Sequence, residues 1–247
     1  GSYYLSGNVA GGSGTNGITV MSSHVQLDLN GFALVGSTNG SNETLIGILI
    51  DDLSMPVNVE IRNGVVCNWG REGIRSVLAK DCRVTGITAS QNGLTNGCDG
   101  MKLGDAWTIT DCLAAGNGGD GIETGSRCTV SRSLFRQNTL CGLKVLTDCR
   151  IFDCSAMWNC HDGLRTGDNS VIKNCSANQN TSNGIRVAVG CVVVDNLCSF
   201  NGNVGTGAGI QAEGEGRVEG NHLRKNQYGI QIPAGATSGK ALVIRNS

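Results

Sequence analysis

Glycine followed by an aliphatic residue recurs along the chain at nearly constant intervals. From Gly17 to Gly229 ten such pairs form a series with intervals of 20 to 30 residues, and four consecutive intervals are 21 residues long. Between the pairs, apolar and polar side chains alternate in short bursts, as from Ile122 to Thr124 and from Cys128 to Val130. This alternation predicts short β-strands, and no stretch has the sustained 3.6-residue period of an amphipathic helix. A repeat of this length is typical of a solenoid.

Asparagine occupies one fixed position of each repeat. Asn tolerates left-handed backbone and suits a corner, and stacked Asn side chains can bond one another. The position three residues earlier is almost always apolar and is predicted to face the interior. We therefore predict an all-β fold, a parallel β-helix solenoid of about ten rungs, here called coils. The corner column is Asn92, Asn117, Asn138, Asn159, Asn180, Asn201 and Asn226.

Composition defines the core of such a helix. The chain has 38 Gly, 2 Pro and only 4% aromatic residues, so Val, Ile, Leu, Ala and Cys must fill the interior. The 12 Cys contain no C-x-x-C spacing and fall largely into two columns, ten and five residues before Asn. We predict that they are small buried side chains; disulfides between columns are the alternative. No metal ligand set and no cofactor is predicted.

Charge argues against a nucleic-acid partner, and hydropathy argues against a membrane-spanning helix. The net charge is −1, so no overall field points to nucleic acid. No apolar run approaches the roughly 18 residues of a membrane-spanning helix. The sequence therefore predicts neither a nucleic-acid partner nor a membrane span.

Two patterns carry a resemblance to a known family. The first is a repeated [D/N/C]-G-[I/L/M]-[K/R/E] followed by x-V-x-x-[C/N]-x-[A/S]-x-x-N, and the second is the opening "GITVMSSHVQLDLNGFALVG". Together they resemble right-handed parallel β-helix proteins of the pectate-lyase-like superfamily. The resemblance covers the whole chain and implies a right-handed helix, an extended polysaccharide as partner and a secreted or cell-surface location. The Asp-Pro-His motif of epimerases and the acidic calcium cluster of pectate lyases are not found.

The domain organisation follows from where the repeat is regular. Residues 1–50 are predicted to form N-terminal entry coils that cap the helix, and residues 51–247 to form regular coils of the same domain. Segments 92–100 and 201–209 carry extra turn residues, which are predicted to bulge from one face and rim a groove. The last residues, "ALVIRNS", resemble the middle of a repeat. We therefore expect further chain or a second subunit to pack on that end, as in a homo-oligomer.

The residue after each aliphatic anchor is predicted to point outward, which creates a charged column. Arg and Lys in this column suit the carboxylates of a uronate polymer. Trp158 precedes an Asn corner, where an exposed ring could stack on a sugar or cover a neighbouring loop. The predicted substrate-binding residues are Arg75, Lys102, Glu123, Arg186 and Trp158.

A second column precedes the Gly and holds carboxylates. If the protein abstracts a proton next to a sugar carboxylate, it needs a base. The resemblance implies an Arg or Lys in that role, so Lys144 or Arg165 is the predicted base. Asp120, Asp162 and His161 are the predicted acid or supporting groups. The structural alternative is that Lys102, Glu123 and Lys144 pair across strands and that each Asp is a turn residue bonding its own backbone.

Two functional hypotheses follow. The protein either binds, and in one version cleaves or modifies, an acidic polysaccharide along the charged column, or it is a non-catalytic structural or adhesive solenoid. The first predicts a cleft in which Lys144, Arg165 and a carboxylate converge. The second predicts a flat column whose charges pair with one another. An ice- or mineral-binding array is disfavoured, because no regular Thr-x-Thr column is present.

Overall fold

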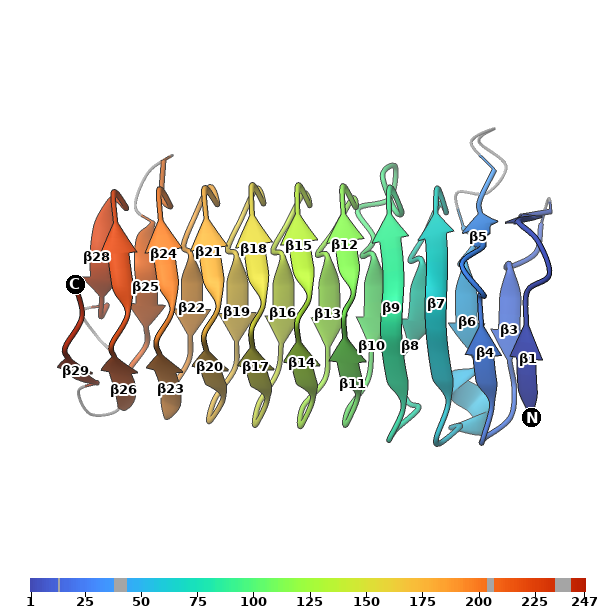
Figure 1. Cartoon of the computed structure of the whole chain (residues 1–247), viewed down its shortest axis with the longest axis horizontal. Coiled ribbons are helices and arrows are strands. Elements are labelled where there is room, and N and C mark those ends of the chain that lie inside the picture. Colours follow the sequence, from blue (N-terminus) through green and yellow to red (C-terminus); the bar gives the residue numbers. More distant parts are fainter. Residues whose placement is uncertain (13, 38–43, 204–206, 234–240) are drawn as a thin grey trace.

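The computed structural model shows one elongated parallel β-helix (Figure 1) and describes residues 1–12, 14–37, 44–203, 207–233 and 241–247. Each coil contributes a strand to a ten-stranded sheet and usually two strands to a nineteen-stranded sheet. Every strand pairing in the described part is parallel, as between Lys144 and Arg165. The predicted all-β solenoid of about ten coils is confirmed.

The ten-stranded sheet contains one short strand from each coil. Most have three residues, the first and third buried and the middle one partly exposed, as in β16. The strands are β3 (Ile18–Val20), β6 (Ile48–Ile50), β8 (Ile74–Ser76), β10 (Met101–Leu103), β13 (Ile122–Thr124), β16 (Leu143–Val145), β19 (Leu164–Thr166), β22 (Ile185–Val187), β25 (Ala208–Ala212) and β28 (Tyr228–Gln231).

The nineteen-stranded sheet begins with strands from the first four coils. Two of them, β7 and β9, are eight residues long and run across the whole face. These strands are β1 (Ser2–Tyr4), β2 (Val9–Ala10), β4 (Gln26–Asp28), β5 (Ala33–Val35), β7 (Glu60–Cys67) and β9 (Arg83–Ser90), and one 3-10 turn, η1 (Asp52–Ser54), lies between β6 and β7.

From residue 108 onward each coil divides its part of this sheet into two strands. A residue with positive φ separates them, such as Asp111 (56°) or Asp153 (56°), and bends the backbone. The strands are β11 (Thr108–Thr110), β12 (Leu113–Ala115), β14 (Thr129–Ser131), β15 (Leu134–Arg136), β17 (Arg150–Phe152), β18 (Ser155–Met157), β20 (Val171–Lys173), β21 (Ser176–Asn178), β23 (Cys191–Val194), β24 (Leu197–Ser199), β26 (Gly216–Glu219), β27 (His222–Arg224) and β29 (Leu242–Ile244).

The core is a single column of side chains along the helix axis. It consists mainly of Val, Ile, Leu, Ala and Cys, with Trp69, Trp107 and Phe135 as its large members. All twelve cysteines are free, and nine of them are buried. The prediction of small buried thiols is confirmed for the two Cys columns, and the disulfide alternative is wrong.

The corner asparagines form a continuous hydrogen-bonded ladder. Asn138 Nδ2 donates to Asn159 Oδ1 at 3.0 Å, and the Asn138 backbone N–H donates to the same oxygen at 3.1 Å. The next step, from Asn159 to Asn180, repeats both bonds. Because these side chains are buried, each coil specifies the corner of its neighbour through bonds that water cannot replace.

Glycine before each strand of the ten-stranded sheet has a steric cause. A Cβ at Gly163 would lie 2.6 Å from both Asn180 Nδ2 and the Gly184 carbonyl oxygen. Neither group can move without breaking the Asn ladder or the strand pairing. The fixed Gly-to-Asn spacing is therefore a packing requirement of the corner.

Residues 1–50 join the same helix as the later coils. Their strands β4 and β5 both pair with β7, and β6 pairs with β8. That they cap the helix stays a prediction, as does the packing of further chain or a second subunit beyond β28 and β29.

Candidate functional site

The charged column lies on the outer surface of the ten-stranded sheet. Its side chains occupy the middle positions of consecutive strands and stack in register, and we call them the charged ladder. Its members are Arg75, Lys102, Glu123, Lys144, Arg165, Arg186, Gln211 and Gln231. The predicted outward direction is correct, because each side chain from Arg75 to Gln211 is partly exposed between two buried neighbours.

Most cations of the ladder are paired. Glu123 accepts hydrogen bonds from Lys102 Nζ at 2.5 Å and from Lys144 Nζ at 2.9 Å. Arg75 donates to Glu72 at 2.8 Å, and Arg186 donates to Glu213 at 2.5 Å. This part of the ladder fits the structural alternative, in which neighbouring charges neutralise one another across strands.

The ion pairs with Lys102 and Lys144 keep Glu123 ionised. Burial disfavours the ionised form of Glu123, but the hydrogen bonds and charges of Lys102 and Lys144 outweigh it and hold its pKa at about 2. The bond to Glu123 raises the pKa of Lys144. At neutral pH, Lys144 is therefore an ammonium group, whereas a general base must be unprotonated.

Arg165 differs from the other cations of the ladder. Within the described part of the chain, no hydrogen bond or ion pair engages its guanidinium group. Its neighbours along the ladder are the cations Lys144 and Arg186. An anion at this point would meet an uncompensated positive charge.

A pocket of about 220 Å³ lies beside Arg165. Its polar lining is Lys144, Arg165, Arg186 and Glu213, and its apolar lining includes Leu146. Lys144, Arg165 and a carboxylate thus line one depression. That they reach a single point within hydrogen-bond distance, as the first hypothesis requires, stays a prediction. The carboxylate is Glu213, which the sequence did not single out.

The Asp column is buried and holds adjacent coils together. Asp99 Oδ1 accepts the Asp120 N–H at 2.7 Å, and Asp120 Oδ1 accepts the Cys141 N–H at 2.7 Å. Asp162 Oδ1 accepts the Asn183 N–H at 3.0 Å. These residues are corners, as the structural alternative predicted. The expectation that each bonds its own backbone is wrong, because the amide comes from the next coil.

Two members of this column form an acidic pair beside Glu123. Burial, together with the charges of Asp120 and Glu123, raises the pKa of Asp99 to about 7. Burial also raises the pKa of Asp120. One oxygen of each of Asp99, Asp120 and Glu123 lies within 4.8 Å of the others. The three carboxyls therefore compete for the two ammonium groups that neutralise Glu123.

His161 and Asp162 lie together at the corner before β19. His161 Nδ1 is 3.3 Å from Asp162 Oδ2 and 3.7 Å from Cys141 Sγ. Asp162 is fully buried, whereas the His161 side chain is 44% exposed. The structure thus brings His161, Asp162 and a thiol together, while the role of His161 and Asp162 as acid or supporting groups stays a prediction.

Trp158 lies at the corner and away from the pocket lining. Its ring is 48% exposed, and its Nε1 donates to Gln179 at 2.8 Å. Phe200 takes the same corner position two coils later, with Lys225 Nζ 5.3 Å from its ring centre. Segment 92–100 lies at the corner between β9 and β10, whereas part of segment 201–209 lies outside the described residues.

Cys141, Glu213 and Glu72 were missed as site residues by the sequence reasoning. Cys141 carries a readable signal, since it takes the place that Asp holds in the coils before and after it. Glu72 precedes Gly73 and so belongs to the column before the glycines, where periodicity could have identified it. Glu213 lies outside the repeated columns, so periodicity could not identify it.

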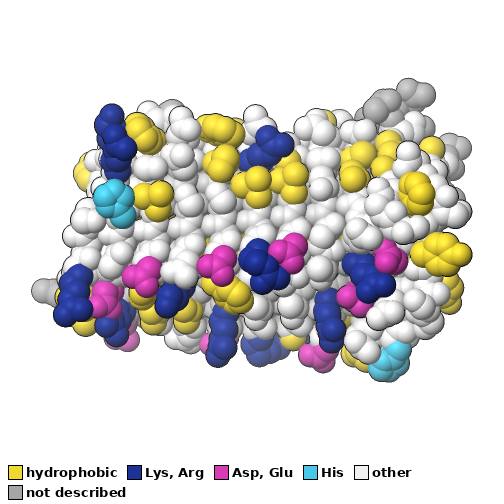
Figure 2. All heavy atoms as spheres, viewed as in Figure 1, with side chains coloured by type: hydrophobic (Ala, Val, Ile, Leu, Met, Phe, Trp, Pro, Cys, Tyr) yellow, Lys and Arg dark blue, Asp and Glu magenta, His cyan; other side chains and the backbone are white. Residues whose placement is uncertain are grey.

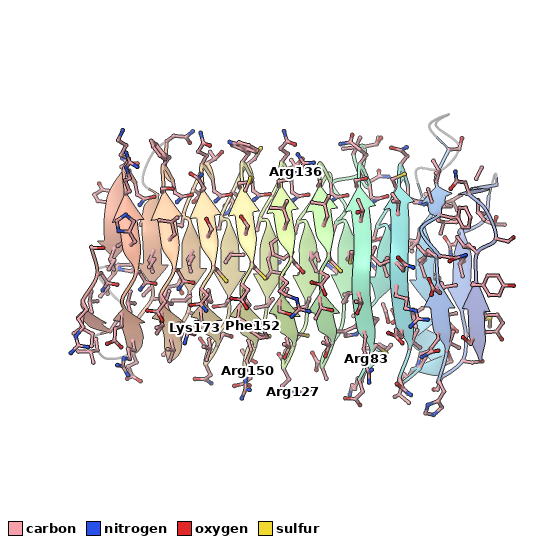
Figure 3. The ribbon with its side chains drawn as sticks, in the orientation of Figure 1. Arg83, Arg127, Arg136, Arg150, Phe152 and Lys173 are labelled. Carbon is pink, nitrogen blue, oxygen red and sulfur yellow. The ribbon has the colours of Figure 1, made fainter. Side chains whose placement is uncertain are left out.

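The opposite side of the molecule has a different charge pattern. Figure 2 shows Lys and Arg side chains next to Asp and Glu along the nineteen-stranded sheet. Arg132 there binds Asp111 at 2.8 Å. Arg150 is exposed on the same sheet, in β17 (Figure 3), and serves below as a comparison for Arg165.

Comparison with known proteins agrees with this architecture. Residues 102–247 match the family described as the right handed beta helix region. The match spans more than half of the chain, which therefore belongs to the right-handed β-helix family. No curated protein matches the sequence significantly. Among the described residues, no helix is long and apolar enough to cross a membrane.

Several solved structures share the fold at low sequence identity. The A-module of the mannuronan C-5 epimerase AlgE4 of Azotobacter vinelandii superimposes with a TM-score of 0.68 at 14% identity, over 89% of this chain and 64% of that one. The periplasmic alginate epimerase AlgG gives 0.59 at 14%, over 94% and 60%. Pectate lyase Pel9A gives 0.53 at 14%, over 90% and 70%. This chain thus shares the right-handed parallel β-helix fold of these structures and spans less than two thirds of the two epimerase structures.

Proposed function

We propose that the protein binds an extended, acidic polysaccharide across the charged ladder, with Arg165 as the central contact. The observation that carries the proposal is that Arg165 lacks an anionic partner within the described chain while lining a pocket with Lys144 and Arg186. A sugar carboxylate would complete its coordination through two parallel hydrogen bonds.

The rest of the pocket supports a sugar over a simple anion. Leu146 is 49% exposed and lines the pocket together with the Ala188 side chain. Sugar rings carry C–H faces that pack on such apolar groups, and Glu213 supplies an acceptor for hydroxyl groups. Flanking coils present Lys102 and Gln211 along the same line, so a polymer rather than a monosaccharide fits the surface.

The solved structures with the same fold support the ligand class. AlgE4 and AlgG are named for epimerisation of mannuronan and alginate, and Pel9A is named a pectate lyase. A secreted or cell-surface location belongs to the same proposal, and AlgG is described as periplasmic.

The catalytic assignments are a finer part of the proposal. Arg165 is the better candidate for contact with the reacting sugar, because the ammonium of Lys144 is bonded to Glu123. Asp120 and Asp162 support the corner from inside, and His161 is the exposed titratable group beside them. An assay for new unsaturated ends on polymannuronate and polygalacturonate, with wild type and Arg165→Gln, tests this part.

Binding is tested by calorimetric titration with oligomers of mannuronate and galacturonate. Wild type is expected to bind them, and Arg165→Gln to lose about 10- to 100-fold in affinity, because a hydrogen bond to a charged group contributes about 1.5–3 kcal/mol. Arg150→Gln, on the other sheet, is the matched control and should bind like wild type. Added salt should weaken binding, since the site is partly exposed.

Two outcomes would contradict the proposal. Equal binding of polyglutamate would show that the ladder recognises negative charge and not a sugar. No binding of any glycan, with wild type folded, would favour the non-catalytic structural or adhesive solenoid, which the self-paired part of the ladder also fits.

A further inference from the structure

One side-chain cluster lies outside the lining of the Arg165 pocket, although two of its members belong to the catalytic assignments above. Cys141, His161 and Asp162 come from two successive coils, at the corner before β16 and β19. One sulfur, nitrogen or oxygen donor atom of each lies within 4.8 Å of the others. We propose that these three atoms bind a divalent transition-metal ion of the zinc type.

An orphaned buried oxygen is the first argument. Asp162 Oδ1 accepts hydrogen bonds from Asn183 N and Nδ2, at 3.0 and 2.8 Å. Asp162 Oδ2 is buried and has no hydrogen-bond partner within the described structure. A buried carboxylate oxygen without a partner is costly. A metal ion at the cluster would satisfy it.

The second argument is that thiol and carboxylate converge on one nitrogen. Both Cys141 Sγ and Asp162 Oδ2 approach His161 Nδ1, at 3.7 and 3.3 Å. In a nucleophilic triad the thiol and the carboxylate use opposite nitrogens of the imidazole. A shared nitrogen therefore excludes the triad, whereas metal ligands must converge on one point.

Distances and donor types agree with zinc. Zn–S of about 2.3 Å and Zn–N or Zn–O of about 2.0 Å give tetrahedral ligand separations of roughly 3.3–3.6 Å. The two measured separations lie at or close to this range. A set of one thiolate, one imidazole and one carboxylate favours zinc-type ions, whereas calcium and magnesium prefer oxygen ligands alone.

The repeat itself marks this corner as unusual. The column that contributes Asp162 has Asp99 and Asp120 in earlier coils, and Cys replaces Asp at position 141 alone among these coils. His161, in the coil that follows Cys141, takes the position held by Gly119 and Leu140 in the two preceding coils. The exposed side of His161 gives an ion access, and three protein ligands leave one coordination position to water.

Zinc titration of chelator-treated, full-length protein tests the site. Calorimetry with zinc chloride is expected to show one binding event that His161→Gln weakens by more than about 100-fold, since even outer-shell partners of metal ligands account for 10–100-fold. Asp162→Asn should do the same and keep the corner, because Asn183 already occupies this column. Cobalt(II) should give thiolate-to-metal charge-transfer absorption that Cys141→Ser abolishes.

Matched controls separate this site from the other thiols and histidines. Cys160→Ser removes the exposed thiol of the same corner, and His222→Gln removes an exposed imidazole elsewhere; both should bind zinc like wild type. Zinc binding that survives His161→Gln, or that depends on Cys160 but not on Cys141, would overturn the proposal. So would calcium binding that requires only Asp162. These readouts use the metal alone and do not depend on polysaccharide binding.

Discussion

At the scale of single residues, equivalent positions of the repeat carry different chemistry because their neighbours differ. Asp99, Asp120 and Asp162 all accept an amide of the next coil. Asp99 and Asp120 lie beside Glu123 and its ammonium partners, whereas Asp162 lies beside His161 and Cys141. The position in the repeat makes each Asp an acceptor for the amide of the next coil. The side chains of the adjacent coil determine which group lies next to its second carboxylate oxygen.

Asp99 makes the stability of the protein depend on pH. Its pKa is raised from an ordinary 3.8 to about 7, by burial and by the charges of Asp120 and Glu123, against Lys102. The neutral form is favoured in the folded state, so this contribution is complete below pH about 4 and is lost as the pH rises through 7.

Asp99→Asn should therefore become more stable relative to wild type as the pH rises from 4.5 to 8. The amide keeps the oxygen that accepts the Asp120 N–H, so the corner is retained. Urea unfolding at several pH values measures the difference. Parallel stability curves for the two proteins would contradict the raised pKa.

At the scale of elements, the corners rather than the strands contain the residues that the fold requires at fixed positions. Most strands are only three residues long, and their parallel pairing is the same in every coil. The Asn ladder and the Gly before each strand of the ten-stranded sheet occur at every regular corner and are packed against each other. Substitutions at corners should therefore be more damaging than substitutions on the outer faces of strands.

Asn159→Ala tests this at the centre of the ladder. It removes the acceptor of the Asn138 N–H and the donor to the Phe135 carbonyl, and both groups are buried. We expect a loss of about 2–5 kcal/mol in the free energy of unfolding, since each unsatisfied buried group costs about 1–3 kcal/mol.

Asn178→Ala is the matched control for this prediction. Asn178 lies on β21, and its partly buried amide makes one bond, to Ser199. Its removal should cost less than about 1 kcal/mol. Urea unfolding compares the two variants, and equal losses would show that the ladder is not a special source of stability.

The fold could be predicted from the sequence because its determinants recur. Asn138, Asn159 and Asn180 are 21 residues apart, and one interpretation of the corner explains all of them. The site could only be predicted in part, because it depends on breaks in the repeat. The pairing of Arg186 depends on Glu213, which lies outside the columns, and the direction of the Asp162 carboxylate depends on the geometry of a turn.

At the scale of the whole molecule, stability is transmitted from coil to coil along the axis (Figure 1). A hydrogen bond in fully buried surroundings is held by packed groups on every side, and one in partly buried surroundings is held less. The same hydrogen bond should therefore open at different rates in different coils.

Hydrogen exchange at two asparagine amides tests this gradient. Asn138 N–H donates to Asn159 Oδ1 at 3.1 Å, and Asn221 N–H donates to Asn246 Oδ1 at 2.9 Å. The bonds are similar in length, but the first is buried and the second is only partly buried. After correction for intrinsic rates, the Asn138 amide should exchange at least about tenfold more slowly. Equal protection would indicate that the helix opens as one unit.

The interchangeable corners have a consequence for how such a chain can change in length. Because each 21-residue segment ends in the backbone geometry with which it began, one segment could be duplicated or deleted without re-forming the junctions on either side. A feature built from a few adjacent coils, such as the Arg165 pocket, would keep its surroundings if the segment were added or removed elsewhere, while its distance from a terminus changed. Duplication or deletion of one repeat in the gene could thus lengthen or shorten the helix by one coil and leave the pocket residues unchanged.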